Sequence, residues 1–203
     1  MNNLQPAARI DPASQRFCDP RGMLVWPRHD PSHARVRLRP FHPDDLPMVQ
    51  DLATDTYVCD IGSLARFAMA SEALEWIAVQ QSRHLHGSAY SFCIASRDGG
   101  VPLGQAVLWT RSLDHGVAGC AYSIAPSYRG RGLAADALRA LVDFGWGLYQ
   151  LHRLELLIEP WNHAALRTAE QAGFAREGLL RSYHQVAGER RDVLVYSRIR
   201  AAR

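Results

Sequence analysis

Residues 123–135 read Ser123-Ile124-Ala125-Pro126-Ser127-Tyr128-Arg129-Gly130-Arg131-Gly132-Leu133-Ala134-Ala135, a passage from an apolar strand through a basic glycine turn into a helix-forming run. A helix N-terminus carries unpaired backbone N–H donors and a partial positive charge. Gly130 and Gly132 leave these donors uncovered, and Arg129 and Arg131 add charged donors beside them. The stretch therefore predicts a pyrophosphate-binding turn, and the alternative is a surface loop with a glycine helix cap.

The segments on either side of the turn predict a strand–helix–strand unit. Residues 117–124 form the strand that leads into the turn, and residues 133–149 repeat apolar side chains at the spacing of an amphipathic helix. Residues 151–158 are an almost continuous apolar run, which is typical of a central strand covered on both faces. A helical crossover between two neighbouring strands makes that pair parallel.

The rest of the chain predicts a mixed α/β sheet, mostly antiparallel, with helices on both sides. Further strands are expected at residues 35–39, 90–94, 101–109, 174–182 and 191–199. A short helix opens at Pro43, and a second begins at the N-cap Ser71 and runs to about His84. A third helix spans residues 162–172, with Gly173 as its C-cap.

The chain divides into an N-terminal arm, residues 1–34, and one domain, residues 35–203. Its 203 residues are enough for one well-buried domain and too few for two full ones. Prolines recur too often in the arm for a helix, and an apolar cluster at residues 23–26 is its one candidate for an edge strand or a docked patch. The arm would either cover a substrate cleft or complete the interface of a homodimer, and the sequence leaves both roles open.

The composition indicates a globular protein without a polyanionic partner. Apolar residues make up 47% of the chain and charged residues 21%, and the net charge of +3 is spread along the chain. Neither nucleic-acid binding nor membrane binding is therefore expected. No apolar run reaches transmembrane length and the N-terminus lacks a signal pattern, which favours a cytoplasmic location.

Neither the cysteines nor the histidines form a recognisable metal or disulfide pattern. The four cysteines are far apart and are expected to be reduced and mostly buried: Cys18, Cys59, Cys93 and Cys120. The pair His84-x-His86 has no third ligand at a recognisable spacing, which favours a solvated helix end over a metal site. No metal is expected.

Two ordered motifs resemble the general-control-type N-acetyltransferase (GNAT) superfamily. Arg129-x-x-Gly132-x-Ala134, which follows a strand and opens a helix, is similar to the family's acyl-CoA loop, Gln/Arg-x-x-Gly-x-Gly/Ala. Downstream, Asn162 leads into an alanine-rich helix that ends at Gly173-Phe174, as in the family's second motif. The resemblance spans the chain from residue 35 to residue 199.

Three further segments resemble one branch of this superfamily, the RimJ/RimL-type ribosomal-protein N-terminal acetyltransferases. The first is Arg35-Val36-Arg37-Leu38-Arg39-Pro40-Phe41, which is followed by two aspartates. The others are Gly173-Phe174-Ala175-Arg176-Glu177-Gly178 and Gly188-Glu189-Arg190-Arg191-Asp192. Members of this branch acetylate protein N-terminal amines, and related families act on polyamines or aminoglycosides.

The resemblance implies acetyl-CoA as co-substrate and assigns the residues that hold it. In the family the two parallel strands splay apart and the pantetheine arm lies in the gap. The implied contacts come from the strand end Ser123, Ile124 and Ala125, from the loop residues Arg129, Gly130, Arg131, Gly132, Leu133 and Ala134, and from Asn162. The loop N–H groups would hold the pyrophosphate, and a backbone N–H of the strand would stabilise the oxyanion.

The catalytic groups are less readable, because the residues that many relatives use are absent. Residues 117–124 contain no carboxylate, so the candidate bases are Glu159 and Asp136, with Glu155, Asp114 and His115 as others and a water chain as the alternative. Relatives place a serine three residues after the asparagine or a tyrosine seven residues after it. Those positions are Ala165 and Ala169 here, which leaves solvent or Tyr183 to protonate the thiolate.

The expected function is direct transfer of an acetyl group from acetyl-CoA to a primary amine in a ternary complex. The acceptor is a protein N-terminus or a small-molecule amine, with an aminoglycoside or polyamine as a further alternative. A different class is also open, namely a domain that binds acyl-CoA without turnover and acts as a sensor or assembly part.

Overall fold

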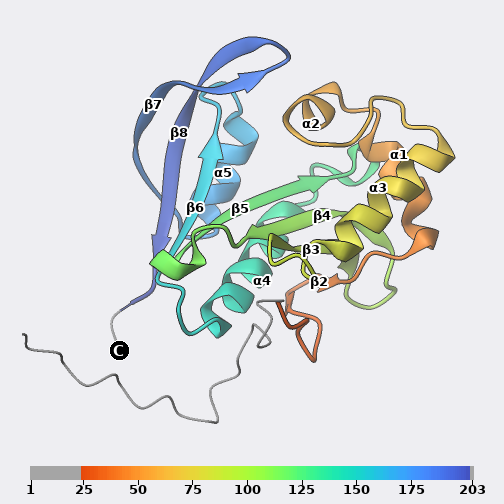
Figure 1. The fold of residues 1–203 in the computed structure, drawn as a ribbon, viewed down its shortest axis with the longest axis horizontal. Helices are drawn as coiled ribbons and strands as arrows, with labels where there is room; N and C mark the ends of the chain where they lie inside the picture. The colour runs from red at the N-terminus through yellow and green to blue at the C-terminus, as the bar shows by residue number, and fades with distance from the viewer. Residues whose placement is uncertain (1–23, 202–203) are drawn as a thin grey trace, which may run out of the picture.

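The computed structural model describes residues 24–201, which fold around one eight-stranded sheet (Figure 1). The strand order across the sheet is β1-β2-β3-β4-β5-β6-β8-β7. The strands are β1 Ser32–His33, β2 Val36–Arg39, β3 Ala89–Ser96, β4 Pro102–Trp109, β5 Val117–Ile124, β6 Arg153–Ile158, β7 Ala175–Val186 and β8 Glu189–Ile199. All neighbours pair antiparallel except β5 and β6, which confirms the predicted mixed sheet with one parallel pair.

Helices cover both faces of this sheet. The α-helices are α1 Leu46–Leu52, α2 Thr56–Ile61, α3 Ala70–Ser82, α4 Leu133–Gly147 and α5 His163–Gln171, and the 3₁₀ turns are Pro43–Asp45, Leu113–His115 and Pro126–Tyr128. Helix α4 makes the crossover from β5 to β6 and packs with α5 on one face, while α1 and α3 lie on the other (Figure 1).

The pleat of β3 sends alternate side chains into two separate cores. Phe92 and Ile94 are fully buried in the core beneath α4, together with Leu138 and Leu141 of that helix. Cys93, between them in sequence, is fully buried in the other core, which α1, α2 and α3 cover. Because successive strand residues point to opposite faces, an apolar run in β3 is consistent with a strand that is buried on both sides.

The structure differs from the prediction in two local details. The N-cap of α3 is Met69 rather than Ser71, and the Glu72 carboxylate accepts a hydrogen bond from the Met69 N–H at 2.8 Å. Strand β6 is not covered on both faces as predicted, because Leu154, Leu156 and Ile158 are buried while Leu157 is 37% exposed. The sequence shows a continuous apolar run here because the exposed residue, Leu157, is itself apolar and lines the cavity.

The predicted arm, residues 1–34, lies mostly outside the described residues, but its last part packs on the domain. Leu24 is buried in the core beneath α4, and its N–H donates to the carbonyl of His84. The Trp26 ring lies 4.8 Å from the ring of Phe92, centroid to centroid, and the Tyr90 hydroxyl donates to the Val25 carbonyl.

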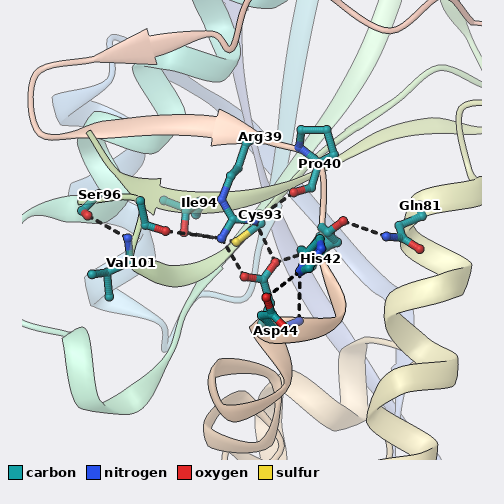
Figure 2. Close-up of polar contacts among 12 residues, drawn as sticks. Arg39, Pro40, His42, Asp44, Gln81, Cys93, Ile94, Ser96 and Val101 are labelled. Carbon is teal, nitrogen blue, oxygen red and sulfur yellow. Dashed lines mark hydrogen bonds and ion pairs between the residues drawn. The ribbon is translucent and has the colours of Figure 1, made fainter. Parts of the chain in front are cut away.

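A buried ion pair fixes the start of the domain, and it involves two residues of the segment that resembles the RimJ/RimL branch. Arg39 of β2 donates two hydrogen bonds to the Asp45 carboxylate, at 2.6 and 2.9 Å, and Asp45 is only 2% exposed. Asp45 also accepts from the His42 N–H at 2.9 Å. Figure 2 shows Arg39 beside the Cys93 thiol and facing the turn that contains His42. The pair therefore ties β2 to the turn that starts α1.

The pKa of Asp45 is held below its ordinary value of 3.8. Burial alone would raise that pKa, but the hydrogen bonds from Arg39 and from the His42 N–H outweigh it. A carboxylate with a lowered pKa in the folded state stabilises the protein above its unfolded-state pKa, and this contribution disappears as the pH falls through the folded-state pKa.

We expect Asp45→Asn to lower the free energy of unfolding by about 3 kcal/mol at pH 7, since it leaves Arg39 without its carboxylate. Urea unfolding followed by circular dichroism measures this loss. The control is Asp44→Asn, because the Asp44 side chain is 89% exposed and its loss should change little. The difference between wild type and Asp45→Asn should shrink as the pH is lowered below 3.8. A difference that stays constant with pH would contradict the role of this pair.

Candidate functional site

A cavity of about 730 Å³ opens where β5 and β6 separate. The parallel ladder joins Val117–Gly119 to Arg153–Glu155 and ends there. Beyond it the cavity is lined by Cys120 to Ile124 on one side and by Leu156 to Ile158 on the other. The separated strand edges leave room for an extended ligand to lie between them.

Gly104 of β4 permits a close approach of β5 to β4 beside the cavity. The carbonyl oxygen of Ser123 lies 2.1 Å from the position that a Cβ on residue 104 would occupy. A side chain there would force the end of β5 off β4, so only glycine permits this approach.

The glycine turn closes one end of the cavity and has the backbone that an anion site needs. Gly130 has a φ of +75° and Gly132 a φ of +72°, so both occupy the left-handed region that favours glycine. Helix α4 starts at Leu133 with Gly132 as its N-cap, and residues 128–135 all line the cavity. The unpaired N–H groups of the first helical turn therefore belong to the cavity end.

Arg35 supports this turn from behind. Its Nε donates to the Asp136 carboxylate at 2.7 Å and its Nη1 donates to the carbonyl of Arg131 at 2.6 Å. The Nη2 atom lies 3.0 Å from the position of a Cβ on Gly132. One side chain thus fixes both the turn and the first turn of α4.

Arg129 connects the turn to α2. Its Nε donates to the carbonyl of Ile124 at 2.9 Å, and its Nη2 lies 2.5 Å from the carboxylate of Asp55. Asp55 is the N-cap of α2, where its Oδ1 accepts from the N–H groups of Tyr57 and Val58. Burial would raise the pKa of Asp55, but the bonds from Arg129 and from these N–H groups lower it.

An aromatic and carboxylate cluster lies at the other side of the cavity. Tyr57 of α2 and Trp161 line it, with their ring centroids 4.7 Å apart in an edge-on arrangement. The Trp161 indole N–H donates to Oε2 of Glu159 at 2.8 Å. Glu159 is 4% exposed, and its Oε1 has no hydrogen-bond partner. A buried polar atom without a partner is unfavourable, which makes this oxygen a candidate acceptor for a functional proton.

The cavity brings together most of the residues that the resemblance assigned to the cofactor. Nine of those residues line it: Ser123, Ile124, Arg129, Gly130, Arg131, Gly132, Leu133, Ala134 and Asn162. Ala125 does not line it, because its side chain is fully buried in the core beneath α1 and α3. Asn162 is also the N-cap of α5, where its Oδ1 accepts from the Ala165 N–H at 3.1 Å.

The three candidate catalytic residues lie in different places. Glu159 lies beside the cavity, next to Trp161 and Asn162. Asp136 does not line the cavity, because its carboxylate is bonded to Arg35 on the far side of the glycine turn. Tyr183 is 52% exposed on β7 and packs against its neighbour His184, away from the cavity lining. The structure thus brings one of the three to the cavity.

Three tyrosines that are not among the predicted site residues line the cavity: Tyr57, Tyr122 and Tyr128. The Tyr122 hydroxyl of β5 lies 3.5 Å from the carbonyl of Ala165, so it occupies space beside one of the alanines that replace the usual proton donors. Burial raises the pKa of Tyr122 to about 12. The alternation of β5 could have identified Tyr122, since it shares a face with Cys120 and Ile124. Tyr57 lies in residues 54–70, where the spacing of the apolar residues is only loosely helical.

Neither a cluster of metal ligands nor an exposed cysteine thiol is found among the described residues. Within residues 24–201 no group of three or more His, Cys, Asp or Glu side chains could hold a metal ion. The described thiols of Cys59, Cys93 and Cys120 are buried and free, and burial raises the pKa of each. In the same part of the chain no helix is long and apolar enough to cross a membrane.

Comparisons with known proteins identify the family. The chain is 26% identical over 163 residues to the uncharacterized N-acetyltransferase p20 of Bacillus licheniformis, covering 80% of this chain and 92% of that protein. It is 27% identical over 164 residues to the spermidine N(1)-acetyltransferase of Escherichia coli K12, covering 81% and 86%. The solved structure of Mycobacterium smegmatis RimJ in complex with CoA-disulfide superposes with a TM-score of 0.66 at 26% identity, over 81% of each chain.

A family model of the acetyltransferase (GNAT) domain matches residues 35–175, which is most of the chain. The match includes β2, the glycine turn, the divergent strands β5 and β6, and α5. The sequence, the sheet topology and the family match agree, and the protein belongs to the GNAT family of N-acetyltransferases.

Proposed function

We propose that the protein transfers an acetyl group from acetyl-CoA to a primary amine by direct attack in a ternary complex. The observation that carries this proposal is the cavity between the diverging strands β5 and β6, which ends at the glycine turn and the N-terminus of α4. The separated strand edges and the helix N-terminus support a site in which a pantetheine arm would lie between the strands and its pyrophosphate would meet the glycine turn.

The residues present fit acetyl-CoA. The turn at residues 129–134 supplies uncovered backbone N–H groups, two arginines, and glycines at positive φ. Asp55 is the one carboxylate among the described lining residues, and Arg129 neutralises it. The pyrophosphate would therefore meet donors rather than unpaired negative charge. When bound, acetyl-CoA supplies the thioester whose carbonyl carbon the amine attacks.

This chain would accelerate the reaction mainly by placement and by electrostatic stabilisation. Holding the amine against the thioester replaces a bimolecular encounter with an oriented one. A backbone N–H of β5 directed at the thioester oxygen would stabilise the oxyanion, and such a donor is typically worth about 2.7–4 kcal/mol of barrier. Glu159 is the predicted base that remains beside the cavity, and Tyr122 is a hydroxyl beside Ala165 from which the thiolate could take a proton.

We propose an acceptor that carries a single ammonium group, either a peptide N-terminus or a small monoamine. A polycation would need several unpaired carboxylates near the cavity. The carboxylates of α1 and α2 are already engaged: Asp51 accepts from the Ser127 N–H, Asp55 pairs with Arg129, and Asp60 pairs with Arg66. Among the described residues beside the cavity this leaves Glu159 as a single carboxylate without an ion pair. The similarity to a spermidine acetyltransferase favours a polyamine as the second candidate, and the acceptor assay below separates the two.

Gly132→Glu should weaken acetyl-CoA binding by at least about 100-fold, since a carboxylate would face the phosphates and displace Arg35. Isothermal titration calorimetry with acetyl-CoA measures the dissociation constant. The control is Gly188→Glu, because Gly188 also has a positive φ of +85° but has no atom within 4 Å of its Cβ position. Unchanged affinity in Gly132→Glu would remove the assignment of the turn to the pyrophosphate.

The acceptor class is tested by thiol release from acetyl-CoA, followed with a thiol-reactive dye against a panel of amines. We expect release with N-terminal peptides or monoamines, and a kcat/KM for spermidine at least about tenfold lower than that of the best acceptor. Spermidine as the preferred substrate would establish the polyamine alternative. Tight acetyl-CoA binding with no release across the panel would instead establish a sensor or assembly role.

A further inference from the structure

We propose that Tyr57 is a catalytic residue that relays the proton of the attacking amine to the buried carboxylate of Glu159. This inference rests on the proposed function, because it assigns the route by which the acceptor amine loses its proton. It goes beyond the expectation of a single base, and it involves α2, a segment in which no functional residue was predicted.

The relay resolves a difficulty with Glu159 as a base. Its carboxylate is almost completely buried and is not part of the cavity lining, so an amine in the cavity would not contact it directly. Tyr57 does line the cavity, and its ring packs edge-on against Trp161, the residue that holds Glu159. The Tyr57 side chain therefore borders both the cavity and the Glu159–Trp161 pair.

Glu159 is arranged to receive a proton at one specific atom. Trp161 holds Oε2 through its indole N–H at 2.8 Å, which fixes the orientation of the carboxylate. The other oxygen, Oε1, is buried and has no hydrogen-bond partner. Leaving such an atom unpaired costs stability, and sites of this kind are concentrated where a function requires them. The edge-on packing of Tyr57 against Trp161 keeps the two aromatic rings in fixed relation to it.

The charges around the phenol favour its protonated form before reaction. Burial is the largest cause that raises the pKa of Tyr57, and the negative charge of Glu159 and that of Asp55 add to it. Asp55 is paired with Arg129, so Glu159 is the unpaired negative charge beside this hydroxyl among the described residues. A neutral phenol whose hydroxyl turns to the open oxygen of a carboxylate during the reaction can accept a proton on its own oxygen as it passes its proton on.

The relay moves one proton from the amine nitrogen to Glu159. The amine nitrogen forms a bond to the acetyl carbon, and its surplus proton moves to the Tyr57 oxygen while the Tyr57 proton moves to Glu159. The carbon–sulfur bond then breaks with its electron pair going to sulfur, and the thiolate takes a proton from the Tyr122 hydroxyl, which water then reprotonates. Glu159 returns its proton to solvent through Tyr57. The products are the N-acetylated amine and free CoA.

The test compares Tyr57→Phe, Glu159→Gln and the double variant with wild type. Phenylalanine keeps the ring packing on Trp161, and glutamine keeps an acceptor for the indole N–H. Each single variant should lower kcat by about 100-fold or more at unchanged acetyl-CoA affinity, and the double variant should be no slower than the slower single variant. Tyr149→Phe is the matched control, because Tyr149 is exposed beyond the end of α4 and should leave kcat unchanged.

Rescue by a conservative variant separates a relay from a merely structural role. Glu159→Asp keeps a carboxylate at this position and should retain a larger part of the wild-type kcat than Glu159→Gln. A kcat for Tyr57→Phe within twofold of wild type, or independent multiplicative losses in the double variant, would overturn the relay. Absence of thiol release in the wild type would overturn the proposed function instead, so the two failures are distinguishable.

Discussion

Hydrogen bonds join β5 to β6 only between Val117–Gly119 and Arg153–Glu155, and beyond these residues the strands separate. Beside this separation Gly104 lets the end of β5 lie close against β4, because the Ser123 carbonyl takes the space of its missing side chain. The cavity, the exposed edge of β5 and the exposure of Leu157 all follow from that separation.

Two arginines near the start of the domain hold the elements around this cavity in place. Arg39 anchors β2 to the turn before α1 through Asp45, and Arg35 fixes the glycine turn through Asp136 and the Arg131 carbonyl. Arg129 then links the same turn to α2 through Asp55. The helix that presents Tyr57 is thus connected by ion pairs to the segment proposed to bind the pyrophosphate. The charged motif at residues 35–45 therefore has a structural role in addition to its likeness to one family branch.

The parts of the fold that could be predicted from sequence are those with a repeating local signal. The strand that leads into the turn, the helical spacing in α4 and the glycines of the turn each depend on a few neighbouring residues, and the structure agrees with them. The cluster of Tyr57, Glu159 and Trp161 joins α2 to the end of β6, a hundred residues apart, and no local pattern encodes that contact. Asp136 was selected because it opens a helix, but its pairing with Arg35 depends on the tertiary fold.

Hydrogen–deuterium exchange with and without acetyl-CoA tests the central claim most directly, because it reports where along the backbone the ligand binds. The account requires slower amide exchange at residues 120–124 of β5 and at residues 129–134 of the glycine turn when acetyl-CoA is added. The distal hairpin at residues 183–190 should exchange at the same rate in both states. Slowed exchange confined to other segments, with acetyl-CoA bound, would show that the gap between β5 and β6 is not the cofactor site.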